Sequence, residues 1–247
     1  MCTLSWVPSG EGYALAFNRD ELRTRAPARP PELREISGLS VLTPIDGDAG
    51  GTWIAANALG HTVTLLNRWD ETPVDTAGEF VSRGLLVLTL SPLAGPQAVE
   101  AMLDELPLPR YRPFTVVSVA PHELPLAFEW NGRALTRAGI EEPGLARTSS
   151  GRDQAGAERV RGGIFREAAN REGGLTPEIL ERLHRGHDPE RGALSICMHR
   201  DEAATVSGSF VQVDRDTVRF KYVDGPPGEW GAETELVLPR LRPDGPR

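Results

Sequence analysis

The chain has 247 residues and a formal net charge of −8 at neutral pH, with 39% hydrophobic and 25% charged residues. This composition is typical of a folded globular protein, and the length predicts one large domain. The acidic balance argues against a nucleic-acid partner, and the absence of an apolar run near ~20 residues argues against a membrane span.

The first residues, from Met1 to Trp6, lack the basic and apolar regions of a secretory signal. We therefore expect a cytoplasmic protein, in which Cys2 and Cys197 are thiols. The sequence gives no indication of the oligomeric state.

The predicted elements come in groups along the chain. Strands joined by tight turns come first, at residues 2–7, 13–17, 52–56 and 61–67, with an irregular excursion over 24–50. Helices are expected at 77–90 and 96–106, followed by strands at 114–119, 124–130 and 133–137. Two further helices are expected at 153–172 and 176–185, before strands at 193–198, 204–213 and 217–223.

This order of elements predicts the fold class. Strands joined by short turns form antiparallel sheets. Alternating groups of strands and helices then indicate an α+β layered sandwich. We expect residues 1–225 to form the domain and residues 226–247 to be a loosely held tail.

The first predicted hairpin places a nucleophile beside a cation. We place its turn so that Cys2 pairs with Phe17, and Cys2 then shares a face with Arg19 because side chains alternate along a strand. A one-residue slip would bring Asn18 and Asp20 to that face instead.

Cys2 directly follows the initiator methionine, which aminopeptidase removes when the second residue is small. Removal of Met1 would leave a thiol and a free α-amine on one residue. The amine has an ordinary pKa near ~7.7–8.0 and the thiol one near ~8.5, so the residue carries both a nucleophile and a base. We expect Arg19 to favour the thiolate and bind an anionic group, and Asp20 to hold the α-ammonium or Arg19.

Several short motifs occur in a fixed order, namely Met1-Cys2-Thr3-Leu4, Asn18-Arg19-Asp20-Glu21, Gly50-Gly51-Thr52-Trp53, Leu66-Asn67 and Ser82-Arg83-Gly84. Together they resemble the NRDE family, also called the transport and Golgi organisation protein family. The resemblance covers roughly residues 1–225. It implies the N-terminal-nucleophile (Ntn) hydrolase fold, an αββα four-layer sandwich of antiparallel sheets similar to penicillin V acylases and bile salt hydrolases.

The resemblance also implies catalytic residues. Cys2 would be the nucleophile, Arg19 and Asp20 its partners, and Asn67 the amide that stabilises the oxyanion. Glu21 competes with Asp20, because the related amidases space their arginine and aspartate differently.

Substrate contacts are implied for five residues, namely Asn18, Glu21, Ser149, Arg159 and Arg161. The two arginines are alternatives for one position. Ser149 lies where the related amidases have a second asparagine, so the oxyanion site is expected to be weakened.

These observations favour an amidohydrolase or acyltransferase that uses Cys2 on a small amide or thioester, without a cofactor. The alternative is a non-catalytic protein of the same fold that binds or carries a lipid, acyl-coenzyme A or haem.

A separate group contains His184, His187, Cys197 and His199, residue types that bind metals. Because Gly186 indicates a helix end there, where histidine and arginine charges are favourable, we predict no metal site.

Overall fold

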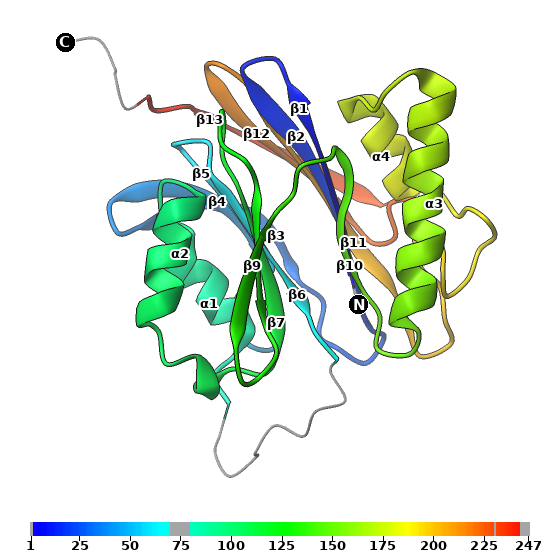
Figure 1. The fold of residues 1–247 in the computed structure, drawn as a ribbon, viewed down its shortest axis with the longest axis horizontal. Helices are drawn as coiled ribbons and strands as arrows, with labels where there is room; N and C mark the ends of the chain where they lie inside the picture. The colour runs from blue at the N-terminus through cyan, green and yellow to red at the C-terminus, as the bar shows by residue number, and fades with distance from the viewer. Residues whose placement is uncertain (1, 70–79, 230, 243–247) are drawn as a thin grey trace.

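The computed structural model describes residues 2–69, 80–229 and 231–242. Two antiparallel sheets lie face to face, and a pair of helices covers the outer face of each (Figure 1). This four-layer α+β sandwich confirms the predicted fold class. No helix in the described part of the chain is long and apolar enough to cross a membrane.

The first sheet holds the N-terminal hairpin near its middle. Within the described residues its strand order is β10-β1-β2-β11-β12-β13. The strands are β1 (Cys2–Ser9), β2 (Gly12–Leu22), β10 (Gly144–Ser149), β11 (Ala203–Val213), β12 (Thr217–Asp224) and β13 (Ala232–Pro239). Its outer face is covered by α3 (Gln154–Glu172) and α4 (Pro177–Arg185).

The second sheet follows the chain from neighbour to neighbour, in the order β3-β4-β5-β6-β7-β8-β9. Its strands are β3 (Arg29–Ile36), β4 (Leu39–Ile45), β5 (Ile54–Asn57), β6 (Thr62–Asn67), β7 (Phe114–Val119), β8 (Leu126–Trp130) and β9 (Leu135–Gly139). It is covered by α1 (Arg83–Leu90) and α2 (Pro96–Glu105), and a short 3-10 turn, η1 (Leu108–Arg110), precedes β7.

Alternation along the strands divides the buried residues among the layers. In β1, Leu4 and Trp6 join the core between the sheets, whereas Val7 joins the core beneath α3 and α4. In β2, Phe17 faces the neighbouring sheet and Ala16 faces the helices. This alternation decides which polar side chains of the hairpin reach the space between the sheets.

The two C-terminal helices begin where capping residues predict. The side chain of Asp153 accepts a hydrogen bond from the backbone N–H of Gly156 at the start of α3. Thr176 caps α4 in the same way, and Pro177 occupies the first helical position.

Four expected elements differ from the structure. Residues 24–50 contain the hairpin of β3 and β4, and residues 226–247 contain β13. Both β3 and β13 are edge strands rich in charged or proline residues, so they lack the apolar alternation of inner strands. Residues 193–198 form no strand, and the helix expected over 77–90 begins only at Arg83, with residues 77–79 outside the described residues.

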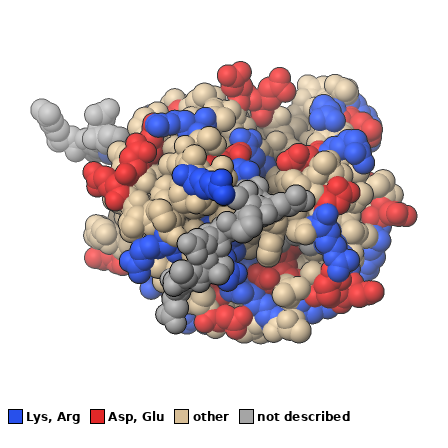
Figure 2. Space-filling view, turned by 60° about the horizontal axis from the view of Figure 1, so that its bottom comes forward, with Lys and Arg blue, Asp and Glu red and all other residues tan. Residues whose placement is uncertain are grey.

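Figure 2 shows basic and acidic side chains interspersed over one face of the molecule, without a continuous basic patch on that face. A surface of this kind does not resemble the clustered positive charge of a nucleic-acid interface.

Candidate functional site

The β1–β2 hairpin brings the thiol and a guanidinium together. Cys2 pairs directly with Arg19, so the predicted pairing of Cys2 with Phe17 was wrong by two residues. The turn lies at Gly10 and Glu11, where Gly10 adopts a positive φ of 56°. Because two residues is the side-chain period of a strand, the predicted shared face of Cys2 and Arg19 is nevertheless correct.

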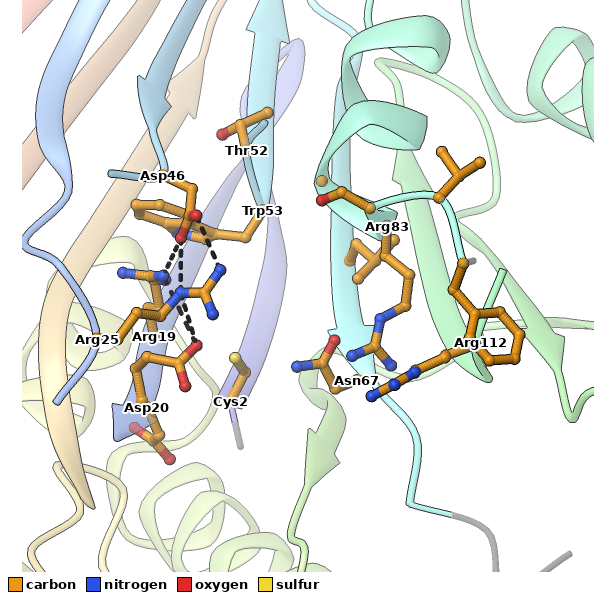
Figure 3. Close-up of a pocket in the computed structure, with 16 residues that line it drawn as sticks. Cys2, Arg19, Asp20, Arg25, Asp46, Thr52, Trp53, Asn67, Arg83 and Arg112 are labelled. Atoms are coloured by element: carbon orange, nitrogen blue, oxygen red, sulfur yellow. Dashed lines mark hydrogen bonds and ion pairs between the residues drawn. The ribbon is translucent and has the colours of Figure 1, made fainter. Parts of the chain in front are cut away.

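Cys2 and Arg19 border a cavity of about 550 Å³ that is lined from both sheets. Figure 3 shows Arg19, Asp46 and Trp53 on one side of Cys2, with Asn67 and two further arginines on the other. The described lining residues are Cys2, Arg19, Asp20, Glu21, Arg25, Asp46, Thr52, Trp53, Leu65, Asn67, Phe80, Val81, Ser82, Arg83, Gly84 and Arg112. Cys2 is only 7% exposed, so its thiol is accessible to a ligand in the cavity rather than to bulk solvent.

Two glycines join the walls of this cavity. A Cβ added to Gly51 would lie 2.4 Å from the backbone carbonyl carbon of Gly84. The N–H of Thr52 donates to the carbonyl of Gly84 at 3.1 Å. The segment before β5 and the start of α1 therefore touch backbone to backbone, and this contact places Trp53 and Arg83 at the cavity.

The Arg19 wall is an ion-pair cluster. Arg19 lies 2.5 Å from Asp46 and 3.7 Å from Glu21, and its guanidinium lies 4.3 Å from the centre of the Trp53 ring. Burial alone would raise the pKa of Asp46, but hydrogen bonds, chiefly from Arg25, hold that pKa below its ordinary value. The charge of Arg19 is therefore largely compensated, and the guanidinium is fixed in orientation.

A second charged pair lies behind the nucleophile, away from solvent. Arg161 and Asp20 are both completely buried at the side chain and lie 3.7 Å apart. Asp20 also accepts a hydrogen bond of 2.6 Å from Thr205. Burial raises the pKa of Asp20, whereas the positive charge of Arg161 opposes that rise.

Arg161 also supports the backbone that carries the thiol. Its Nη1 donates to the hydroxyls of Thr3 at 2.6 Å and Thr148 at 2.8 Å, and the Thr148 hydroxyl donates to the carbonyl of Cys2 at 3.0 Å. Arg161 does not line the cavity, so its contacts fit a residue that positions Cys2 rather than one that touches a ligand.

The Cys2 thiol lies in an environment that favours the protonated form. Burial raises its pKa, and the carboxylates of Asp20 and Glu21 act in the same direction. The backbone N–H of Asp20 donates to the sulfur and opposes this rise. Arg19 is not among the main influences on this pKa, so its expected effect on the thiolate stays a prediction.

The opposite wall carries Asn67 and two arginines. Asn67 ends β6, across the cavity from Cys2 (Figure 3). Arg83 donates to the carbonyl of Pro113 at 2.7 Å, and burial, together with the charge of Arg112, lowers its pKa to about 10. Within the described residues, neither Arg83 nor Arg112 makes an ion pair with a carboxylate, in contrast to Arg19.

Other residues predicted to contact substrate lie elsewhere. Asn18 faces the helices, where its amide donates to the carbonyls of His184 and Ile196. Ser149 pairs with Cys2 across β1 and β10 and lines a neighbouring cavity of about 190 Å³, which shares Asn67 with the cavity at Cys2. Arg159 lies on the exposed side of α3.

Some residues of the site were not predicted. Trp53 and Arg83 lie inside the motifs that carry the family resemblance, but the sequence assigned them no role. Their place at the cavity follows from the contact between Gly51 and Gly84. Asp46 and Arg112 lie in segments without a recognisable signal. Both reach the cavity through long-range contacts that no local pattern indicates.

A comparison with family models identifies a match. The family model described as Transport and Golgi organisation 2 matches residues 1–136. No curated protein matches the chain significantly.

Solved structures share the fold at low sequence identity. A variant of conjugated bile acid hydrolase from Clostridium perfringens has a TM-score of 0.59 and 10% identity, over 97% of this chain and 96% of that chain. Penicillin V acylase from Agrobacterium tumefaciens has a TM-score of 0.56 and 10% identity, over 96% of this chain and 91% of that one. A Caenorhabditis elegans ortholog of N-acylethanolamine-hydrolyzing acid amidase has a TM-score of 0.53 and 11% identity, over 85% and 92%. At such identities the likeness shows the Ntn-hydrolase fold alone.

Proposed function

This chain belongs to the Transport and Golgi organisation 2 family, and we propose that it is an amidohydrolase or acyltransferase whose nucleophile is Cys2. One observation carries the proposal. The second residue of the chain presents its thiol to a cavity of about 550 Å³, directly opposite an oriented guanidinium. The fold it shares with several amide-cleaving enzymes supports the same reaction class.

The proposed reaction begins with removal of Met1, which frees the α-amine of Cys2. Because burial raises the pKa of the thiol, a base must take its proton, and the α-amine is the nearest base that the chemistry allows. The sulfur then attacks the carbonyl of an amide or thioester. The α-ammonium returns the proton to the leaving group, and water or an acceptor amine releases the acyl group from the resulting thioester.

The proposed roles of the surrounding residues follow from their positions. Asn67, across the cavity, donates its amide to the oxygen that becomes negative in the tetrahedral intermediate. Arg19 and Glu21 form the wall beside the thiol, and Arg161 fixes the strand that carries it. Asp20, whose N–H reaches the sulfur, orients the nucleophile from behind.

The charge of the cavity suggests the substrate class. Arg83 and Arg112 face the cavity without an ion-pair partner among the described residues, so they are available to a ligand carboxylate or phosphate. We propose a small acylated molecule with an anionic group, its scissile carbonyl between Cys2 and Asn67.

The proposal is tested with a fusion whose proteolytic removal leaves Cys2 as the first residue. The cleaved protein should gain one acyl group from an activated acyl ester, detected by intact-mass spectrometry and located at Cys2 by peptide mapping. The uncleaved fusion is the matched control and should gain none, because its α-amine is blocked.

Two variants separate the possible outcomes. Cys2→Ala should abolish acylation, whereas Cys197→Ser should retain it. Equal labelling of the cleaved and uncleaved forms would contradict the mechanism. Tight binding of acyl-coenzyme A or haem with no adduct at Cys2 would instead support the carrier alternative.

A further inference from the structure

Two imidazoles and a thiol converge at a place remote from the proposed catalytic residues. His187 lies in the loop after α4, and Cys197 and His199 lie in the stretch that leads into β11. None of the three lines the cavity at Cys2. One ligand atom from each lies within 4.8 Å of the other two.

The separations resemble those of a tetrahedral zinc site. Nitrogens about 2.0–2.1 Å from a zinc ion are about 3.3 Å apart, and a nitrogen and a thiolate sulfur are about 3.6 Å apart. Here the Nε2 atoms of His187 and His199 are 3.0 Å apart, and the Cys197 sulfur lies 3.8 Å from Nε2 of His199. Small side-chain movements would bring all three atoms to coordinating distance.

The surrounding backbone holds these side chains in place. The N–H of Cys197 donates to the carbonyl of Gly186 at 3.1 Å, and the N–H of His199 donates to the carbonyl of Gly192 at 3.0 Å. Burial raises the pKa of the Cys197 thiol to about 11, and the N–H of Gly228, which donates to the sulfur, opposes that rise. A Cβ on Gly228 would lie 2.4 Å from the backbone oxygen of Arg185 and 2.5 Å from Cε1 of His187, so this position accepts a glycine only.

His184, which the sequence grouped with these residues, is not part of the cluster. Its Nε2 lies 2.8 Å from the hydroxyl of Ser5 and its Nδ1 lies 3.0 Å from Asn18. Both ring nitrogens are therefore occupied, and His184 serves the core beneath α4. The structure thus separates a structural histidine from two others that point at a thiol.

We propose that His187, Cys197 and His199 bind a zinc ion, with a fourth position open to water. Cys197 would coordinate as a thiolate, and its proton would be released to solvent on binding. The ion would join the loop after α4 to the segment before β11. This site is distinct from Cys2 and does not depend on the function proposed above.

Arg191 is expected to oppose binding. Its Nη2 lies 3.3 Å from Nδ1 of His199, and it also pairs with Glu229. Coordination through Nε2 places the remaining proton of His199 on Nδ1, to which a guanidinium cannot donate. Arg191 must therefore turn away on binding, as its 59% exposed side chain permits.

The test uses Co²⁺ and Zn²⁺ with the full chain. Titration with Co²⁺ should give one equivalent of binding with a thiolate-to-cobalt charge-transfer absorption, and Zn²⁺ should displace it and raise the melting temperature. Cys197→Ser should remove this absorption. His199→Gln, at a half-buried position, should weaken binding by more than the ~10–100-fold typical of outer-shell changes.

Matched controls use the same residue types elsewhere in the chain. Cys2→Ser and His122→Gln should retain the full spectrum, and Arg191→Gln should bind Zn²⁺ more tightly than the unmodified chain. Absence of a charge-transfer band, or its loss in Cys2→Ser rather than Cys197→Ser, would overturn the proposal. If Cys197→Ser does not fold, His199→Gln decides the question. An unchanged metal affinity of His199→Gln would reject the site.

Discussion

Replacing Arg161 with glutamine should destabilise the protein by about 3–5 kcal/mol, the usual consequence of removing one partner from a buried ion pair. Arg161 is fully buried, lies 3.7 Å from Asp20 and donates to Thr3 and Thr148. Glutamine is shorter and neutral, so it retains at most one of these hydrogen bonds and none of the charge compensation. The carboxylate of Asp20 would then be buried without the charge of Arg161.

The loss should depend on pH in a direction that follows from Asp20. Burial already raises the pKa of Asp20, and without Arg161 that pKa rises further. The folded variant then binds a proton that the unfolded chain has released, so its stability falls as the pH rises above the ordinary aspartate value of 3.8. The difference from the unmodified chain should be largest near neutral pH and should shrink in acid.

The assay is urea unfolding followed by tryptophan fluorescence at several pH values. Arg159→Gln is the matched control, because it removes the same charge from the exposed side of the same helix, and it should stay within about 0.5 kcal/mol of the unmodified chain. Equal stabilities of the two variants, or a difference that does not change with pH, would refute the role assigned to the buried pair.

Three further predictions concern the cavity and the core. Gly51→Ala should lower the melting temperature and slow acylation of Cys2, because the added Cβ would collide with Gly84. Calorimetry measures the first effect and mass spectrometry the second, and normal values for both would contradict the contact. Arg83→Met should raise KM for anionic acyl donors by about tenfold and leave neutral donors unchanged, so an equal effect on both would argue against an anion site. Burial lowers the pKa of His61 to about 4 and that of His184 to about 3, so the unfolded chain binds more protons below the ordinary value of 6.5. The contribution of these two histidines to stability should therefore be complete above pH 6.5 and should be lost, by several kcal/mol, toward pH 3. Unfolding curves that do not change over this range would refute the prediction.

The sequence predicted the face of the hairpin more reliably than its register. The turn cluster allowed several closures, and the structure closes it at Gly10 and Glu11, two residues away in register from the predicted pairing. A shift of two residues preserves the alternation, so Cys2 and Arg19 still meet. A shift of one residue would have placed Asn18 beside the thiol and Arg19 beneath the helices.

The residues that sequence reasoning missed act over long distances along the chain. Asp46 follows a strand that was not predicted, and it reaches Arg19 only because β3 and β4 extend the second sheet. The choice between Arg159 and Arg161 depended on the rotation of α3 about its axis. The weak amphipathicity of that helix gave no indication of its buried face, whereas the structure shows Arg161 completely buried.

The two charged pairs around Cys2 differ in their surroundings. Arg19 and Asp46 border the cavity, where a ligand can contact them, and Arg25 also pairs with Asp46, so changes there should alter substrate handling more than folding. Asp20 and Arg161 have completely buried side chains, so changes there should unfold the protein before they reveal a catalytic effect. A buried pair of charges therefore supports the nucleophile, and a second charged pair borders the cavity proposed to receive the substrate. Variants of Asp20 or Arg161 should mainly change stability, whereas variants of Arg19 or Asp46 should mainly change activity.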